Sequence, residues 1–263
     1  MSRARSVTAR ASVVLAPNPG PMTLEGTNTW VLQEPDGTGV VIVDPGPLDE
    51  GHLAAVVSAA TAGTSSGPPA RVDAVLLTHR HLDHSEAASR CSELAGAPVL
   101  ALDPQLSAQP LAAGDCLTFG GLRVDVIATP GHTSDSVSFW LPEDSAVLTG
   151  DTVLGRGSSV VAHPDGRLAP YLSSLERLRE LGDARVLPGH GPELPSARAV
   201  TELYLEHRQD RLVAVRSAMA SGARTPREVV ETVYADVDES LWPAAELSVR
   251  AQLEYLEAEA PAP

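Results

Sequence analysis

A single hexapeptide at residues 79–84, His-Arg-His-Leu-Asp-His, contains four side chains that can bind a metal ion. It follows an apolar run at 72–78, which is typical of a buried β-strand. The alternation of side chains along such a strand would send His79 and His81 to the same side, towards one ion. Asp83 and His84 lie just before an expected helix at 85–95, so the turn could direct them to a second ion. We therefore predict that this segment forms the floor of a two-metal site.

Three more side chains of the same kind follow short apolar runs that we expect to be strands. His132 comes after 122–128 in the sequence Thr-Pro-Gly-His-Thr, Asp151 follows 146–149, and His190 follows 185–187 in Gly-His-Gly. Folds of the α/β class place their sites just beyond the ends of strands. Five of the eight histidines belong to this set, which argues against a chance distribution.

The seven side chains divide into two sets of metal ligands. We assign His79, His81 and His132 to the first ion, and Asp83, His84 and His190 to the second, with Asp151 as a bridge. Zinc binds imidazole and carboxylate groups, and its catalytic sites keep one position open for water; iron or manganese are the alternatives. Two ions about 3.5 to 4 Å apart can share a hydroxide, a nucleophile available near neutral pH. Its targets are electrophilic carbonyl carbon or phosphorus, and Asp83 is the expected catalytic proton acceptor.

The composition limits the class of protein. The chain of 263 residues is 43% hydrophobic, enough for one substantial core and a small appendage. Its net charge of −15 disfavours broad DNA binding, and all 19 basic residues are arginine, which removes lysine-based phosphate loops and Schiff-base chemistry. Two cysteines are too few for a disulfide framework. No apolar run is long enough to cross a membrane, so we expect a cytoplasmic protein with a short cationic tail at 1–11.

The remaining pattern predicts a mixed α/β fold in two parts. Residues 1–195 carry the metal-binding residues and form the hydrolase domain, whereas residues 196–263 read as a small helical subdomain. The expected hairpins are 29–33 with 39–44 and 116–119 with 122–128, and the expected helices are 50–60, 85–95, 168–181, 197–221, 226–234 and 240–260.

The hexapeptide, with His132, Asp151 and His190 in their motifs, resembles the metallo-β-lactamase superfamily. That resemblance implies an αββα sandwich, with two facing sheets, outer helices and a dinuclear site at one edge. Residues 18–22 (Asn-Pro-Gly-Pro-Met), 26–29 (Gly-Thr-Asn-Thr), 171–178 and the pair His207-Arg208 are similar to the β-lactamase-like protein 2 group. The group implies a winged-helix-like C-terminal subdomain and links to cleavage of single-stranded RNA, although many bacterial relatives are known only as hydrolases.

Several activities stay open within this resemblance. Zinc β-lactamases typically carry a different ligand where Asp151 stands, so antibiotic hydrolysis is disfavoured. The substrate is a small-molecule ester or thioester, or a phosphodiester such as single-stranded RNA. The alternatives are a thioesterase like glyoxalase II, a dioxygenase of persulfides with one iron, and a binding module with a structural metal. The oligomeric state is left open between a monomer and a homodimer.

For residues around the metal ligands, the sequence gives weaker indications of function. Asn28, Arg156 and Ser158, with Ser159 beside it, are candidates for substrate binding, because an amide, a guanidinium and hydroxyls can hold a phosphate or carboxylate. His163 is a candidate proton donor to the leaving group, and His207 reads as a structural residue of its helix. The residues expected to orient the ligands are Thr78, Arg80 and Ser85.

Overall fold

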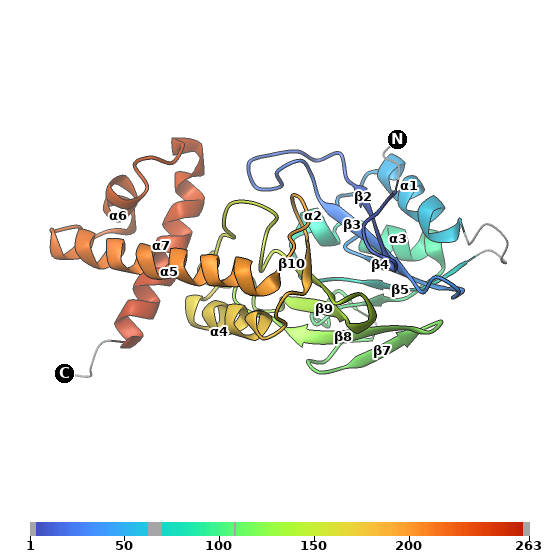
Figure 1. Cartoon of the computed structure of the whole chain (residues 1–263). Helices are drawn as coiled ribbons and strands as arrows, with labels where there is room; N and C mark the ends of the chain where they lie inside the picture. The colour runs from blue at the N-terminus through green and yellow to red at the C-terminus, as the bar shows by residue number, and fades with distance from the viewer. Residues whose placement is uncertain (1–3, 63–69, 108, 260–263) are drawn as a thin grey trace.

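The computed structural model describes residues 4–62, 70–107 and 109–259. Two β-sheets face each other, and helices cover both outer faces (Figure 1). The six-stranded sheet has the order β1 (Arg5–Ser6), β2 (Ala11–Leu15), β3 (Asn28–Gln33), β4 (Gly39–Val43), β5 (Arg71–Leu76) and β6 (Val99–Leu100). The five-stranded sheet has the order β11 (Arg185–Pro188), β10 (Ala146–Gly150), β9 (Val137–Leu141), β8 (Leu122–Ala128) and β7 (Cys116–Phe119).

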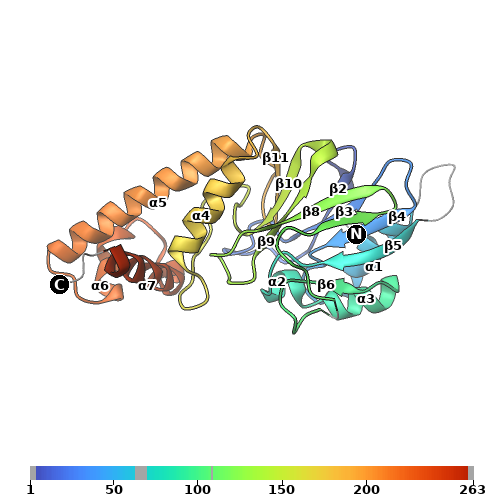
Figure 2. The same ribbon diagram turned by 90° about the horizontal axis from the view of Figure 1, so that it is seen from below.

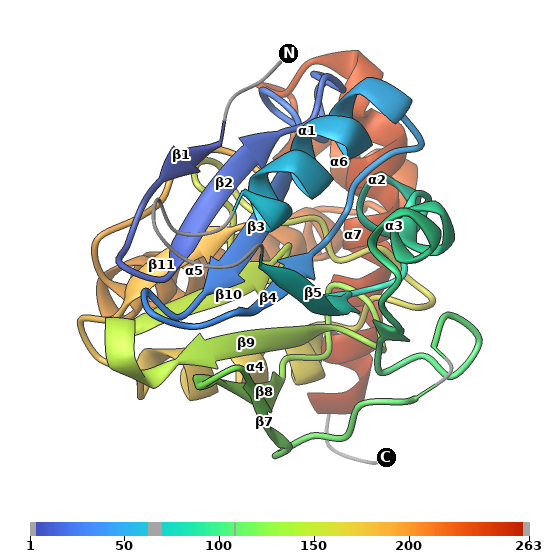
Figure 3. The ribbon, with the colours of Figure 1, turned by 90° about the vertical axis from the view of Figure 1, so that its right-hand side faces the viewer.

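The alternation of side chains in each sheet produces the four layers. In β4, Val41 and Val43 enter the core between the sheets, whereas Val40 and Ile42 pack beneath α1 (Glu50–Thr61) and α3 (Ala88–Ala95). In β10, Val147 packs on the outer face, with residues of α4 (Leu168–Arg179) and α5 (Ala197–Ala220). Figure 3 shows α1 lying across β2 and β3. The predicted αββα sandwich is therefore confirmed.

The hexapeptide differs from the sequence prediction in its local structure. Strand β5 ends at Leu76, and the short helix α2 (Leu82–Ser85) already contains Asp83 and His84. His79 and His81 therefore lie in a loop, and the prediction that β alternation aligns them is wrong. Leu77 and Thr78 carry the chain out of the sheet before the histidines begin.

The N-terminal segment is also different from the expected cationic tail. Residues 5–6 form strand β1, which pairs with β2. Arg10 forms ion pairs of 2.7 Å with both Glu34 and Asp144, so its charge is used inside the fold. The tail prediction is wrong for this part of the segment, whereas residues 1–3 lie outside the described residues.

The C-terminal part is helical. It consists of α5, α6 (Pro226–Val233), a 3₁₀ turn η2 (Glu239–Leu241) and α7 (Trp242–Glu259), with a small core of its own around Val215, Val230 and Val249. The first half of α5 packs on α4, and Figure 2 shows the helix running from the sandwich to the other C-terminal helices. The boundary at 195/196 stays a prediction. None of the described helices combines the length and apolar character needed to cross a bilayer.

Candidate metal centre

The structure brings all seven predicted ligand side chains together at one edge of the sandwich. They come from the loop after β5, from α2 and from the loops after β8, β10 and β11. Backbone hydrogen bonds join these segments across the edge. The Val137 amide donates to the Thr78 carbonyl at 2.8 Å, and the Gly189 amide donates to the Gly150 carbonyl at 2.9 Å. The two sheets therefore hold the site in common.

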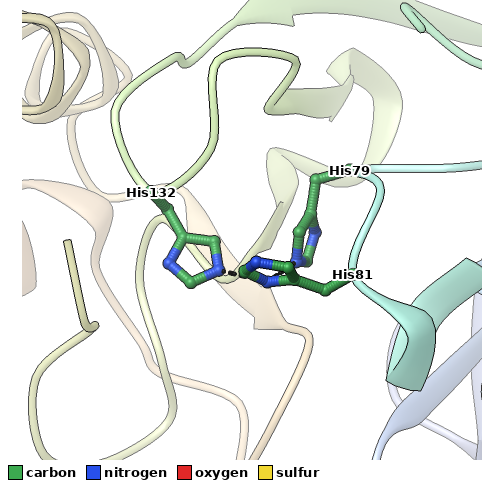
Figure 4. Close-up of side chains that lie close together, drawn as sticks. All are labelled: His79, His81 and His132. Atoms are coloured by element: carbon green, nitrogen blue, oxygen red, sulfur yellow. Dashed lines mark hydrogen bonds between the residues drawn. The ribbon is translucent and has the colours of Figure 1, made fainter. Parts of the chain in front are cut away.

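The first set consists of three imidazoles around one point (Figure 4). His81 Nδ1 lies 3.1 Å from His79 Nε2 and 2.9 Å from His132 Nε2. With zinc–nitrogen bonds of about 2.0 to 2.1 Å, nitrogens of a tetrahedral site lie about 3.3 to 3.4 Å apart. Small rotations of these rings would fit one ion.

The second set lies beside the first. His190 Nε2 is 3.1 Å from Asp83 Oδ2 and 3.1 Å from His84 Nε2. His84 and His190 are fully buried, whereas the Asp83 side chain is 29% exposed. Two nitrogens and one oxygen with an open side match a catalytic metal position.

Asp151 lies between the two sets. Its Oδ1 is 3.3 Å from His84 Nε2, and its Oδ2 is 3.4 Å from His190 Nε2 and 3.8 Å from His132 Nε2. The Oδ1 atom is buried without a hydrogen-bond partner in the described parts of the chain. A buried carboxylate oxygen needs a cation or a donor. The donor set therefore fits two divalent ions with Asp151 between them.

The outward nitrogens of four histidines are held by other groups. Each of these contacts fixes the ring so that Nε2 faces the centre. The partners are Thr78 Oγ1 for His79 (3.0 Å), Asp44 Oδ2 for His84 (2.9 Å), the Val160 carbonyl for His132 (2.7 Å) and the Gly26 carbonyl for His190 (3.2 Å). Of the three residues expected to orient ligands, Thr78 does so. Arg80 instead pairs with Asp135 at 3.0 Å, and Ser85 donates to the Arg80 carbonyl.

The sequence interpretation missed Asp44. This carboxylate is 1% exposed and accepts hydrogen bonds from the Thr78 amide at 2.8 Å and the Thr78 hydroxyl at 2.7 Å, besides contacting His84. Its φ of 54° is rare for a residue other than glycine and is a form of strain found at functional sites. The available signal was its position at the end of β4, the parallel neighbour of β5.

A glycine makes room for the ligands. A Cβ atom at Gly189 would lie 2.6 Å from both Asp151 Oδ1 and His84 Cε1. Any side chain there would therefore displace one of the two groups. This contact explains the Gly-His pattern before the last ligand.

The residues predicted to contact the substrate lie in different surroundings. The Asn28 amide donates to the carbonyls of Pro188 at 3.0 Å and Gly191 at 2.8 Å, so a structural role replaces the expected contact. Arg156 pairs with Glu25, yet it lines a cavity of about 160 Å³ together with Ser158, His132 and Asp151. His163 lies 4.0 Å from Glu254 and does not line this cavity.

Burial and neighbouring charges shift the pKa values of the ligand histidines in different directions. Burial lowers the pKa of His190, but hydrogen bonds to Asp151 and Asp83 outweigh it and raise this pKa to about 9. The pKa of His84 also lies well above its ordinary value, because Asp151 and Asp44 overcome the effect of burial. The pKa of His79 is well below its ordinary value because of burial and the neighbouring histidines.

We expect metal binding near neutral pH to release protons from His84 and His190. Both imidazoles are protonated in the free protein below their raised pKa values, and a metal binds only the neutral ring. As the pH falls below these pKa values, the apparent affinity for metal should fall by about tenfold per pH unit for each proton that is displaced. Calorimetric titration with zinc in two buffers of different ionisation enthalpy measures this release. Equal observed enthalpies in both buffers would contradict the expectation.

The sequence matches two family models. The metallo-beta-lactamase superfamily model matches residues 22–106 and 101–190, and the beta-lactamase associated winged helix domain matches residues 225–260. The chain is 30% identical over 235 residues to a beta-lactamase-like protein 2 homolog of Caenorhabditis elegans, covering 85% of this chain and 76% of that protein. It is 32% identical over 238 residues to an atrochrysone carboxyl ACP thioesterase of Aspergillus fumigatus, covering 84% and 72%.

Solved structures share the fold. A metallo-beta-lactamase family protein from Thermus thermophilus superposes with a TM-score of 0.77 at 24% identity and covers 95% of this chain and 93% of its own. A second protein, solved in a di-iron-bound form, has a TM-score of 0.53 at 30% identity and covers 74% and 98%.

Proposed function

Because the chain belongs to the metallo-β-lactamase superfamily, we propose that it is a dinuclear metal-dependent hydrolase acting on a small-molecule thioester or ester. The observation that carries the proposal is the place of Asp151, whose two oxygens face histidines of both ligand sets. A site for one ion would need neither the second set nor a carboxylate between the sets. The relative solved in a di-iron-bound form supports two ions, and zinc is the expected metal.

The proposed ligands are those assigned from the sequence. His79, His81 and His132 would hold one ion, Asp83, His84 and His190 the other, and Asp151 both. Two bound divalent ions lower the pKa of water and polarise the oxygen of the attacked carbonyl. The protein's own side chains would carry out the rest of the reaction.

Asp83 is the proposed proton acceptor. Burial raises its pKa, but the hydrogen bond with His190 and the charges of His84 and His190 together outweigh burial and lower the pKa below its ordinary value. Its carboxylate is therefore ionised at neutral pH and, being 29% exposed, accessible from the open side. In hydrolysis of a thioester, Asp83 takes one proton of the attacking water, the carbon–sulfur bond breaks and the thiolate leaves. The buried rings of His84 and His190 keep their positions throughout.

A thioester is the favoured substrate class for two reasons. One relative, matched over 84% of this chain, is named as a thioesterase, and the net charge of −15 works against binding a polyanion such as RNA. Single-stranded RNA stays the second candidate through the similarity to the β-lactamase-like protein 2 homologs. The two free cysteines favour a cytoplasmic location, and a homodimer stays a prediction.

The test is a substrate panel on protein of measured metal content. Acyl thioesters, an aryl ester, single-stranded RNA and a persulfide with oxygen are offered to the zinc, iron and manganese forms. We expect thioester hydrolysis that requires about two ions per chain and is lost with a chelator. Oxygen uptake with a persulfide by protein holding one iron would contradict the proposal, and so would cleavage of RNA alone.

A further inference from the structure

A second cavity continues from the metal site towards the C-terminal helices. It measures about 220 Å³ and lies between the 158–160 loop, α5, the segment before α7 and the first turns of α7. It shares five lining residues with the cavity that contains His132 and Asp151, namely Pro21, Met22, Ser158, Ser159 and Val160. A molecule bound at the metal site could therefore extend into this second space, here called the helical-side cavity.

The charge of the helical-side cavity is opposite to that of the chain. Its lining includes His207, Arg208 and Arg211 of α5 and contains no aspartate or glutamate. Among the described residues, neither Arg208 nor Arg211 has a carboxylate within ion-pair distance. Other described arginines, such as Arg177 and Arg198, also form no ion pair, so the feature that distinguishes Arg208 and Arg211 is their position on this cavity.

Two donors at this cavity have no acceptor within the described chain. Arg208 is 4% exposed and donates through Nη2 to the Ser159 carbonyl at 2.5 Å, but its Nε is buried without a partner. His207 Nε2 accepts from Arg211 Nε at 3.4 Å, which places the histidine proton on Nδ1. That Nδ1 is also buried without a partner. Buried donors of this kind require an acceptor.

Two contacts fix the side chain of Arg211. It donates through Nη1 to the Val233 carbonyl at 2.7 Å, and its guanidinium lies 4.6 Å above the ring of Tyr234. These contacts fix the side chain without neutralising its charge. A fixed guanidinium binds carboxylate and phosphate groups with good geometry.

We propose that the helical-side cavity binds an oxyanion, a carboxylate or a phosphate, at the end of the substrate remote from the scissile bond. His207 and Arg211 hold the anion, and Met22, Tyr234 and Leu241 provide apolar contacts for the connecting chain. This inference rests on the proposed function and narrows its substrate to an anionic small molecule. His207 then has a role in binding, beyond the structural role expected from the sequence.

The test uses two pairs of thioethers that cannot be hydrolysed. S-methyl phosphopantetheine is compared with S-methyl pantetheine for a phosphate, and S-methylglutathione with its diamide, which lacks both carboxylates, for a carboxylate. Each is titrated calorimetrically into zinc-loaded and metal-free protein. We expect at least one member with the anionic group to bind about tenfold to hundredfold more tightly than the partner that lacks this group, in both forms. The pair that shows the difference identifies the anion.

Two variants locate the effect. Arg211→Gln should abolish the preference for the anion. Arg227→Gln is the matched control, because Arg227 also lies 4.6 Å above an aromatic ring, that of Trp242, but pairs with Glu231 and Glu246 and does not line the cavity. Equal binding of both members of each pair by the wild-type protein would overturn the inference, even if Arg211→Gln failed to fold. Equal loss in both variants would overturn it as well.

These measurements need no turnover. Hydrolysis without a preference for anions would refute this inference alone. Anion binding without hydrolysis would refute the proposed function alone.

Discussion

Replacing Asp151 by asparagine is expected to lower kcat for thioester hydrolysis by about a thousandfold, because a metal ion contributes several kcal/mol to transition-state stabilisation. The amide keeps the shape of the carboxylate but removes the negative charge that faces His84, His132 and His190. Without that charge, the two ligand sets no longer share an anionic group. The measurements are kcat and the metal content per chain by elemental analysis, and both should fall together.

Asp125→Asn is the control for this variant. Asp125 lies on β8 of the five-stranded sheet, and its carboxylate forms an ion pair with the exposed Arg123 at 2.8 Å. An exposed pair of this kind contributes about 0 to 1 kcal/mol to stability. The control should therefore keep both its metals and its activity. Full kcat with two metals in Asp151→Asn would remove Asp151 from the proposed centre.

The second large effect is expected at Asp44, which touches no substrate. Asp44→Asn replaces a buried acceptor of hydrogen bonds from Thr78 and His84 by a group that is partly a donor. We expect the free energy of unfolding of the metal-free protein to fall by about 3 to 5 kcal/mol, the cost of removing one partner of a buried ion pair. We also expect metal affinity to fall by about 10- to 100-fold, because His84 loses the group that orients its ring.

Urea unfolding and competition with a chelator measure the two effects separately. Asp49→Asn is the comparison, because the Asp49 side chain accepts from the His52 amide at the start of α1 and contacts no ligand. Asparagine caps a helix about as well as aspartate, so this change should cost less than about 1 kcal/mol, from the lost charge at the helix start, and leave metal affinity unchanged. If folded Asp44→Asn bound metal as tightly as the wild type, Asp44 would have no part in orienting His84.

The sequence predicted which side chains gather at one edge of the sandwich better than it predicted their local structure. Side chains that bind metals are few in kind, and their position after apolar strands indicated a common edge. The sequence predicted the path of the chain between these side chains less well, because β5 ends at Leu76. A loop, and not the alternation of a strand, directs His79 and His81. The layers of the sandwich followed from alternation within strands such as β4.

Residues that act through distant partners could not be predicted in the same way. Asp44 meets Thr78 and His84, and Arg10 meets Asp144, across 34 to 134 positions of sequence. Arg208 reaches the Ser159 carbonyl from α5, and the Ser159 hydroxyl lies 3.2 Å from His132 Nδ1. Patterns within a short stretch of sequence do not reveal such pairs. Their partners became visible only when the two sheets and α5 were placed together.

The most direct test of the dinuclear site is a crystal structure of the zinc-reconstituted protein with anomalous data at the zinc edge. We expect two zinc ions per chain, about 3.5 to 4 Å apart, with Asp151 in contact with both. The first should contact His79, His81 and His132, and the second Asp83, His84 and His190. One fully occupied ion, with Asp83 and His190 left without metal, would contradict the dinuclear assignment.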